Sequence, residues 1–246
     1  MPVVSVDLAY RSYSDIGVCV LTSLGGTINA EFVPLEPLEL AAPTPEQVAS
    51  RCLELCAKVG ARLLLLDGPQ GWKDPDNGLA HARVCEGALN TPGKTGLPGI
   101  TKPANYAPFI RFAIGVFDAL HEAGWPRVPD ANGENLPART AVETFPLSAW
   151  RTLGLRPLPS KAKSRPTDLQ SGLTALVHMF DLRVHGTPDH DQLQALVAGL
   201  GGIALELGAT DGYRLVGSPP YRHDGTWREG YILNPLAPRP RPFGST

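Results

Sequence analysis

The chain has 246 residues, 43% of them hydrophobic and 19% charged, with a formal net charge of −2. This length and composition predict one large folded domain, expected over residues 1–235, with an insertion at about 68–138 and a flexible Pro-rich tail at 236–246. The near-neutral charge excludes the strongly basic surface of a tight non-specific DNA binder, although it does not exclude an enzyme whose metal ions neutralise phosphates.

The sequence carries no signal for membrane insertion or secretion. No apolar run is long enough to cross a bilayer and no signal-peptide pattern leads the chain, so we expect a cytoplasmic protein without a membrane partner. The cysteines have no metal-binding spacing. Cys52 and Cys56 are four residues apart on an expected helix, which is typical of two small apolar side chains on one helix face.

The N-terminal part of the chain predicts three strands. Residues 2–8 form an apolar, mostly β-branched run, residues 16–21 form a second run, and residues 27–33 form an alternating third one. Tight turns separate the three runs. Strands joined in this way predict an antiparallel meander.

A helix and a fourth strand follow the meander. Thr44 is the expected N-cap, Pro45 occupies the first helical position and Gln47 completes a capping box, so the helix should run to about residue 59. Residues 63–66 then form a continuous apolar run. Such a run is typical of a strand buried on both faces of a parallel sheet.

Residues 68–98 are rich in Gly, Pro and Asn and too long for a plain connection, which predicts a functional loop or an insertion. A helix is expected at 105–123, because large apolar side chains recur there at helical spacing.

The second half of the chain alternates strands and helices. We expect a strand at 139–145, a short helix at 146–153 and longer helices at 167–180 and 189–207, with a basic connector at 157–166. Small residues in the last helix suit close packing on a sheet. A meander that changes to strand–helix alternation predicts an α/β fold with a mixed sheet flanked by helices.

Four acidic residues lie at or within these elements. Asp7 and Asp67 each close an apolar strand, Glu143 lies within a strand, and Asp191 opens a helix. A carboxylate at the end of a buried strand is costly to desolvate unless a partner or a metal compensates. Several carboxylates at one point repel each other and attract divalent cations. The pattern therefore predicts a metal-dependent phosphoryl-transfer site.

A plainer interpretation stays open for each acid. Asp7 and Asp67 also suit the capping of turns. Glu143 could face solvent on an edge strand. Asp191 could simply favour a helix N terminus, where Asp189 is an alternative N-cap.

Six short motifs contain or accompany these acids: Val6-Asp7-Leu-Ala, Leu66-Asp67-Gly-Pro-Gln-Gly71, Arg83-Val-Cys-Glu86, Val142-Glu143-Thr-Phe-Pro146, His190-Asp191-Gln-Leu-Gln-Ala195 and Glu229-Gly-Tyr-Ile-Leu-Asn-Pro235. In this order they resemble the ribonuclease H-like superfamily, and more specifically a family of predicted nucleases called domain of unknown function 429. Together they span most of the chain, although each is short.

The resemblance implies a ribonuclease H-like mixed sheet and a nuclease that cleaves phosphodiester bonds with two Mg²⁺ or Mn²⁺ ions. It implies a nucleic acid partner, DNA or RNA. The implied catalytic and metal-binding residues are Asp7, as the bridging ligand, with Asp67, Glu143 and Asp191. One position departs from the family pattern, because the expected second acid of the last helix is Gln194 here.

Three basic residues are candidates for substrate binding: Arg83, Lys94 and Lys102. Arg83 could instead form a surface ion pair with Glu86, three residues further along one helix face.

Aromatic and polar residues near the motifs also have two interpretations. Trp72 and Tyr106 could stack on bases or serve as buried loop anchors. His190 could shuttle a proton or simply lie on the surface. Glu229 is expected to fix the C-terminal segment.

Sequence motifs also bear on competing functions. The chain has no P-loop and no nucleophile elbow, which argues against P-loop nucleotide hydrolases and α/β-hydrolases. An actin-like phosphotransferase shares the strand order but needs two repeated halves. A ribonuclease H-like module that only binds or regulates is the remaining alternative, and the low basic content and Gln194 favour it.

Overall fold

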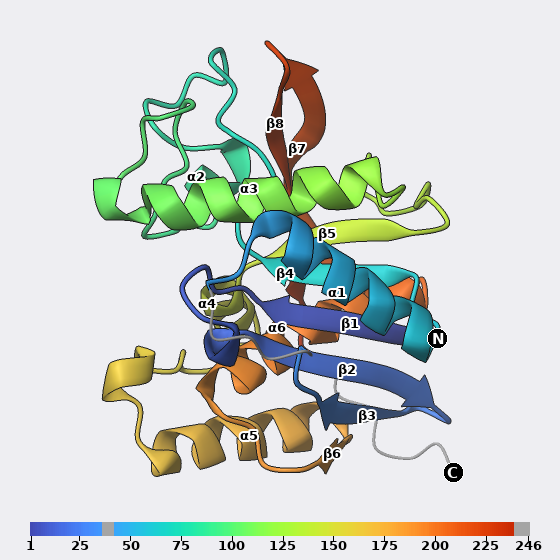
Figure 1. The fold of residues 1–246 in the computed structure, drawn as a ribbon. Helices are drawn as coiled ribbons and strands as arrows, with labels where there is room; N and C mark the ends of the chain where they lie inside the picture. Colours follow the sequence, from blue (N-terminus) through green and yellow to red (C-terminus); the bar gives the residue numbers. More distant parts are fainter. Residues whose placement is uncertain (36–41, 239–246) are drawn as a thin grey trace.

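A continuous run of buried residues places β1 (Pro2–Asp7) in the middle of a sheet. The computed structural model describes residues 1–35 and 42–238, and within these ranges eight strands form one sheet in the order β6-β3-β2-β1-β4-β5-β8-β7 (Figure 1). Val4 and Val6 face one side of the sheet and Val3 faces the other. The sheet therefore has a hydrophobic core on each face.

The predicted meander is confirmed. β1 pairs antiparallel with β2 (Gly17–Leu24), and β2 pairs antiparallel with β3 (Thr27–Phe32). Gly25 and Gly26 have positive φ angles of 60° and 86° in the turn between β2 and β3, a backbone conformation that glycine adopts without strain.

Parallel strands complete the sheet on the other side of β1. β4 (Leu63–Asp67) runs parallel to β1, β5 (Thr140–Thr144) runs parallel to β4, and β8 (Thr226–Pro235) runs parallel to β5. A meander followed by parallel strands is the mixed α/β sheet that the sequence predicts, and it is compatible with the ribonuclease H-like sheet that the resemblance implies. Because Val6 lies opposite Leu66, the next residues of the two strands, Asp7 and Asp67, end at the same edge of the sheet.

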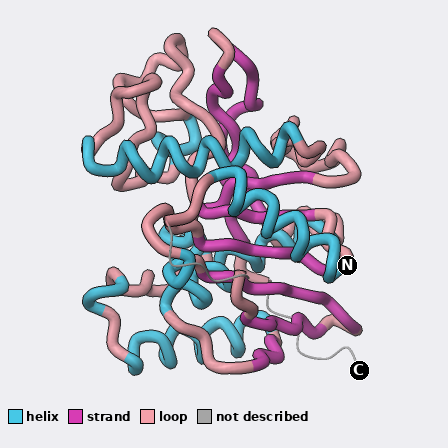
Figure 2. The backbone as a smooth tube through the Cα atoms, viewed as in Figure 1, coloured by secondary structure: helices cyan, strands magenta, loops and turns pink. Residues whose placement is uncertain are grey.

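Two helices cover one face of the sheet (Figures 1 and 2): α1 (Pro45–Val59) and α3 (Ala107–Glu122). The predicted capping box of α1 is present, with Thr44 accepting from the backbone N–H of Gln47. The buried Cys52 and Cys56 belong to the core beneath these helices, as the sequence predicts. Since α3 lies within the span expected as an insertion, the irregular part of that span is chiefly residues 68–103 before it.

The other face carries α4 (Pro146–Thr152), α5 (Pro166–Phe180) and α6 (His190–Glu206). A Cβ atom on Gly199 would lie 2.4 Å from Leu21 Cδ1, and one on Gly202 would lie 2.3 Å from Leu65 Cδ1. The glycines thus let α6 lie close to β2 and β4 without displacement of these leucine side chains, as the small residues of this helix predict.

Gly17 brings the start of α6 to the acidic edge of the sheet. Gly17 pairs with Asp7 across the meander, and a Cβ atom on it would lie 2.1 Å from the carbonyl carbon of Asp191. Any larger residue would push the first turn of α6 away from β2. Gly17 therefore sets how near Asp191 comes to Asp7.

The C-terminal hairpin was not predicted. β7 (Tyr213–His223) contains Pro219 and Pro220, which favour a loop in a sequence-based interpretation. The structure accommodates both prolines at the sheet edge, where the pairing with β8 shifts register between Ser218 and Tyr221. The short strand β6 (Leu182–His185), which pairs with β3, was also missed, whereas the short helix α2 (Val84–Ala88) lies where the sequence places Arg83 and Glu86 along one helix face.

The described ranges contain no helix long and apolar enough to span a membrane. The expected Pro-rich tail at 236–246 lies outside the described residues from 239 onward.

Candidate functional site

Two carboxyl groups meet where β1 and β4 end. Asp7 and Asp67 are both partly buried, and their side chains share a hydrogen bond. Burial raises the pKa of Asp7 well above its ordinary value, and the neighbouring charges of Asp67 and Asp191 raise it further. Burial also raises the pKa of Asp67 to about 7, with a further contribution from Glu143. Near neutral pH this pair therefore holds a proton or attracts a cation.

Asp191 lies close enough to influence Asp7, but its own carboxylate is already engaged. Its Oδ2 accepts a hydrogen bond from Lys161 Nζ at 2.5 Å, and its Oδ1 lies 3.0 Å from His190 Nδ1. Burial alone would raise the pKa of Asp191, but these two partners outweigh burial and lower it. Lys161 also bridges to Asp15 Oδ1 at 2.8 Å. The basic connector thus supplies a cation to the acidic edge.

The first turn of α6 resolves two open interpretations. Asp189 is the N-cap, since its side chain accepts from the backbone N–H of Gln192. Gln194 has its carbonyl oxygen engaged by a residue outside the acidic set, because its Oε1 accepts from Trp150 Nε1 at 2.8 Å. His190 is held between Asp191 and the carbonyl of Pro159.

Glu143 is paired with Arg83 rather than exposed. Arg83 donates to both carboxylate oxygens, at 2.7 and 2.5 Å, and the backbone N–H of Gln70 adds a third bond at 3.0 Å. Arg83 and Glu143 are only 1% and 2% exposed. Burial raises the pKa of Glu143, although Arg83 opposes this. The interpretation of Glu143 as a solvent-facing edge residue is therefore wrong.

The predicted substrate-binding residues hold the long loop together. Arg83 also pairs with Glu86 at 3.1 Å, a buried contact and not the surface ion pair that the sequence suggests. Lys94 Nζ donates to the carbonyls of Glu86 and Thr91 at 3.1 and 2.6 Å. Lys102 is exposed, and its Nζ lies 2.6 Å from His81 Nε2. Their contact with substrate stays a prediction, and for Arg83 it requires the pair with Glu143 to open.

Glu229 ties this loop to β8. Its carboxylate accepts from the backbone N–H groups of Asp74 and Val84, at 3.0 and 2.8 Å, and from Asn77 Nδ2 at 2.6 Å. Glu229 itself has a φ angle of 55°. The sequence predicts that Glu229 holds the C-terminal segment in place. In the structure Glu229 lies on that segment, in β8, and holds the loop against it.

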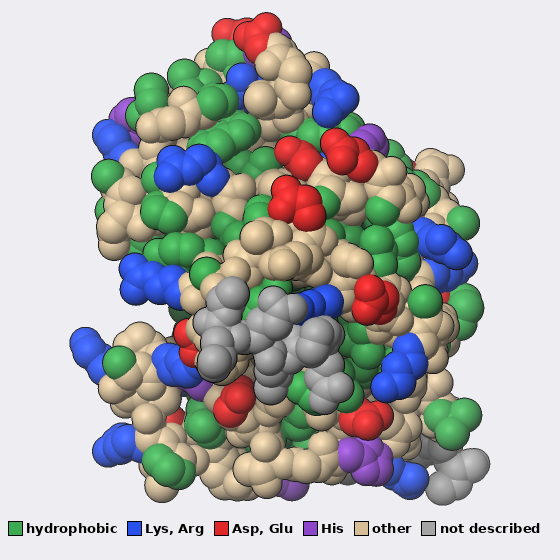
Figure 3. All heavy atoms as spheres, viewed as in Figure 1, with side chains coloured by type: hydrophobic (Ala, Val, Ile, Leu, Met, Phe, Trp, Pro, Cys, Tyr) green, Lys and Arg blue, Asp and Glu red, His purple; other side chains and the backbone are tan. Residues whose placement is uncertain are grey.

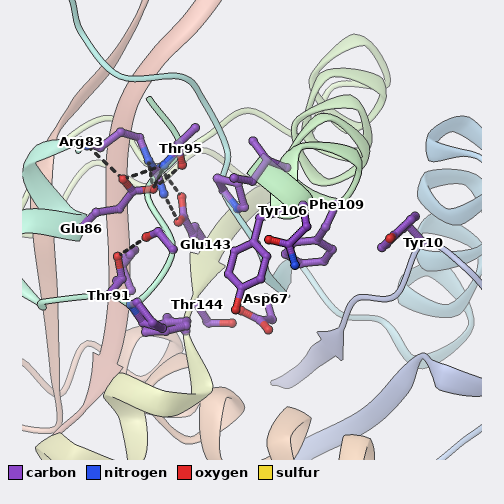
Figure 4. Close-up of a pocket in the computed structure, with 18 of the residues that line it drawn as sticks. Tyr10, Asp67, Arg83, Glu86, Thr91, Thr95, Tyr106, Phe109, Glu143 and Thr144 are labelled. Atoms are coloured by element: carbon purple, nitrogen blue, oxygen red, sulfur yellow. Dashed lines mark hydrogen bonds and ion pairs between the residues drawn. The ribbon is translucent and has the colours of Figure 1, made fainter. Parts of the chain in front are cut away.

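A cavity of about 520 Å³ opens beside Asp67 (Figure 4). Arg83, Glu86 and Glu143 lie at one side of it. Tyr106 and Phe109 form an aromatic wall, and Tyr106 is 40% exposed, so it is not the buried anchor that one sequence interpretation suggests. Trp72, by contrast, is buried as expected.

Several cavity residues carry no recognisable sequence signal. Tyr10 and Phe145 lie on connections after strands, and Thr144 looks like any residue of β5. Thr144 is 1% exposed, and its Oγ1 has no hydrogen-bond partner among the described residues. An unpartnered buried hydroxyl is a destabilising feature that a bound molecule can relieve.

The geometry limits how metal could bind. Within residues 1–35 and 42–238, no group of three or more His, Cys, Asp or Glu side chains is arranged to hold an ion. The Asp7–Asp67 pair matches the usual coordination of Mg²⁺. This ion typically binds one or two carboxylates and fills its remaining coordination positions with water and phosphate oxygens.

Lys and Arg side chains lie along both the left and the right edges of the molecule in Figure 3, and the left edge is the one at which β1 and β4 end in Figure 1. Exposed cations from loops here include Arg11, which lines the cavity, and Lys161. The sheet edge that carries the acids therefore also carries charges that suit an anionic partner.

Lys161 is expected to compete with metal at this edge. In Lys161→Gln the ammonium group beside Asp191 is lost, so Mn²⁺ should bind about fivefold more tightly, equivalent to about 1 kcal/mol because Lys161 is half exposed. Isothermal titration calorimetry measures the change in affinity for Mn²⁺. Lys163→Gln, on the same short helix, is the control. Unchanged or weaker binding in Lys161→Gln would show that Lys161 does not compete.

Comparisons with known proteins add little to this picture. No family model and no curated protein matches the chain. The structure is similar to that of Thermus thermophilus RuvC, with a TM-score of 0.39 and 14% identity over 85% of this chain and 97% of that chain. A TM-score of this size does not by itself show a common fold, so the fold class rests on the strand order and directions. The likeness to domain of unknown function 429 stays a resemblance of motifs.

Proposed function

We propose that this protein is a Mg²⁺- or Mn²⁺-dependent nuclease that hydrolyses phosphodiester bonds at Asp7 and Asp67. The observation that carries the proposal is the shared hydrogen bond between these two carboxyl groups at the ends of adjacent parallel strands. Open α/β sheets bind ligands at this edge. A carboxyl pair that would otherwise hold a proton near neutral pH is a ready site for a divalent cation.

Asp7 and Asp67 would hold one ion between them. Such an ion, when bound, activates water and stabilises the leaving oxygen of a phosphodiester. The two-metal scheme needs a second set of ligands from Asp191 and Glu143. Both carboxylates are engaged by cations of the chain itself, so a second ion requires at least Lys161 to leave Asp191.

A nucleic acid partner is supported by charge and by resemblance. The net charge of −2 provides no general attraction for phosphates, but exposed cations such as Arg11 and Lys161 lie beside the acids. The motif order that resembles domain of unknown function 429, a family of predicted nucleases, points the same way.

A non-catalytic nucleic-acid-binding module is the second candidate. The observation that favours it is the neutralisation of Asp191 by Lys161 and of Glu143 by Arg83, which leaves Asp7 and Asp67 without further acidic ligands. The actin-like phosphotransferase requires two related halves, and the described residues form a single sheet.

A cleavage screen separates the two candidates. Wild type and Asp67→Asn are incubated with single-stranded, double-stranded and junction forms of DNA and RNA in Mg²⁺, Mn²⁺ or a chelator. We expect metal-dependent cleavage by wild type and a loss of more than about a hundredfold in Asp67→Asn, since a direct ligand is removed. Asp224→Asn at the exposed β7–β8 turn is the matched control.

Binding without cleavage under every condition would favour the module. Equal cleavage by wild type and Asp67→Asn would rule out the proposed site.

A further inference from the structure

The cavity beside Asp67 has the size and walls of a binding site for a flat ring. We propose that it takes one unpaired nucleobase of the nucleic acid, next to the phosphate that lies at Asp7 and Asp67. This inference rests on the proposed function and specifies its substrate class. The volume of about 520 Å³ falls within the range of about 300–1,000 Å³ that is common for small-molecule sites.

Two aromatic rings of the cavity pack against the backbone of neighbouring glycines. A Cβ atom on Gly93 would lie 2.7 Å from Tyr106 Cδ2, so the loop backbone packs directly against that ring. A Cβ atom on Gly68 would lie 3.2 Å from Phe109 Cζ, so the second ring is supported in the same way. Tyr10 stands across from Phe109, with ring centroids 6.5 Å apart. A base can stack on rings presented in this way.

The charges of the lining favour a neutral ligand. Asp67, Glu86 and Glu143 bring three carboxylates, while Arg11 and Arg83 bring two guanidinium groups. Arg83 is already paired with both glutamates. A phosphate placed inside the cavity would face the carboxylates of the lining, whereas an uncharged base would not. The phosphate is better placed outside the cavity, where an ion held by Asp7 and Asp67 and the exposed Arg11 can meet it.

The polar groups of the cavity suit the edge of a base. Thr144 lines the cavity, is 1% exposed and has an Oγ1 atom without a partner among the described residues. Figure 4 shows the hydroxyl of Tyr106 directed toward Asp67 and Thr144. Both hydroxyls can donate or accept a hydrogen bond, so they can pair with a ring nitrogen or an exocyclic group.

Such a site selects for unpaired nucleotides. A base that is paired and stacked in a duplex cannot enter a cavity, and bringing it out costs unstacking energy. Single strands, bulges and junctions present bases that are already free. The substrate class is therefore a nucleic acid with an unpaired base beside the scissile phosphate, rather than a continuous duplex.

The test uses binding in a chelator, so that it does not depend on catalysis. Short single-stranded oligonucleotides carrying 2-aminopurine are titrated into wild type, Tyr106→Ala, Thr144→Val and Tyr221→Ala. Tyr221 is 38% exposed and lies outside the cavity lining, which makes it a matched control for Tyr106. Stacking in the cavity should quench the fluorescence of 2-aminopurine.

We expect Tyr106→Ala to lose about tenfold in affinity together with most of the quenching, which corresponds to the loss of one stacked base. Thr144→Val should bind about threefold to tenfold more weakly with a melting temperature no lower than wild type, because it replaces only an unpartnered hydroxyl. Tyr221→Ala should match wild type. The same oligonucleotide within a full duplex should bind with little quenching.

Equal affinity and quenching in wild type and Tyr106→Ala would overturn the proposal, and so would equal quenching by paired and unpaired probes. If the protein cleaves nucleic acid but gives either of these results, only the cavity proposal is overturned. If it quenches the probe as expected but never cleaves, the cavity proposal stands and the nuclease proposal is overturned.

Discussion

Replacing Arg83 with methionine is expected to destabilise the protein by about 3–5 kcal/mol, because it leaves the buried carboxylate of Glu143 without its cation. Glu143 is 2% exposed, and both of its oxygens accept from Arg83. Glu86 loses a partner at the same time. Urea denaturation of wild type and Arg83→Met measures the difference in unfolding free energy.

Two further variants sharpen this experiment. In the double variant Arg83→Met, Glu143→Gln, most of the lost stability should return, since no unpaired charge remains buried at that position. Arg165→Met removes an ion pair whose arginine is 77% exposed and should leave the unfolding midpoint unchanged. If Arg83→Met were as stable as wild type, the ion pair with Glu143 would not be what holds the loop on β5.

Asp7→Asn is expected to abolish binding of Mn²⁺ and to reduce cleavage by more than about a hundredfold, because it removes one of the two carboxylates available to an ion. The same change should stabilise the metal-free protein by about 1–3 kcal/mol at pH 8. That figure corresponds to relief of the burial and of the repulsion from Asp67 that together raise the pKa of Asp7, reduced because water partly reaches both side chains.

The pH dependence of stability follows from the raised pKa values of Asp7 and Asp67. The folded-state pKa of Asp67 is raised to about 7 from an ordinary 3.8, and that of Asp7 is raised as well. A carboxyl with a raised folded-state pKa binds its proton more tightly in the folded protein. Stability from this source is therefore complete below about pH 4, falls as pH rises toward about 7, and is absent above that.

Thermal unfolding in a chelator between pH 5 and pH 8 should show this decline in wild type and a flatter profile in Asp7→Asn. Titration calorimetry with Mn²⁺ completes the test. Mn²⁺ binding to Asp7→Asn as tight as to wild type would contradict the assignment of Asp7 as a ligand.

The sequence predicts the acid pair well because local patterns determine it. Asp7 and Asp67 each end an apolar run, and parallel pairing of two such strands brings their ends to one edge. The meander, α1 with its capping box, and the close-packed α6 follow from equally local signals.

The partners of the remaining acids could not be predicted in this way. Arg83 reaches Glu143 from 60 residues earlier in the chain, and Lys161 reaches Asp191 from a connector without a periodic pattern. Which cation meets which acid depends on how the irregular loop folds over the sheet, and composition and periodicity do not encode that.

The hairpin was missed for a different reason. Pro219 and Pro220 resemble loop residues, and their place in a strand depends on β7 lying at the edge of the sheet, where a backbone N–H is not required on both sides. The cavity was missed because its walls come from separate connections that meet only in the folded chain.

The hydrogen bonds from the loop to Glu229 imply an order in which the site is assembled during synthesis. Asp7 and Asp67 both emerge from a ribosome early, and β1 and β4 can pair as soon as residue 67 has been made. The loop that walls the cavity is fastened by a side chain on β8, 145 to 155 residues later in the chain. Asp7 and Asp67 are thus synthesised long before the residue that fastens the loop around them. The growing chain therefore has no organised site until β8 joins the sheet.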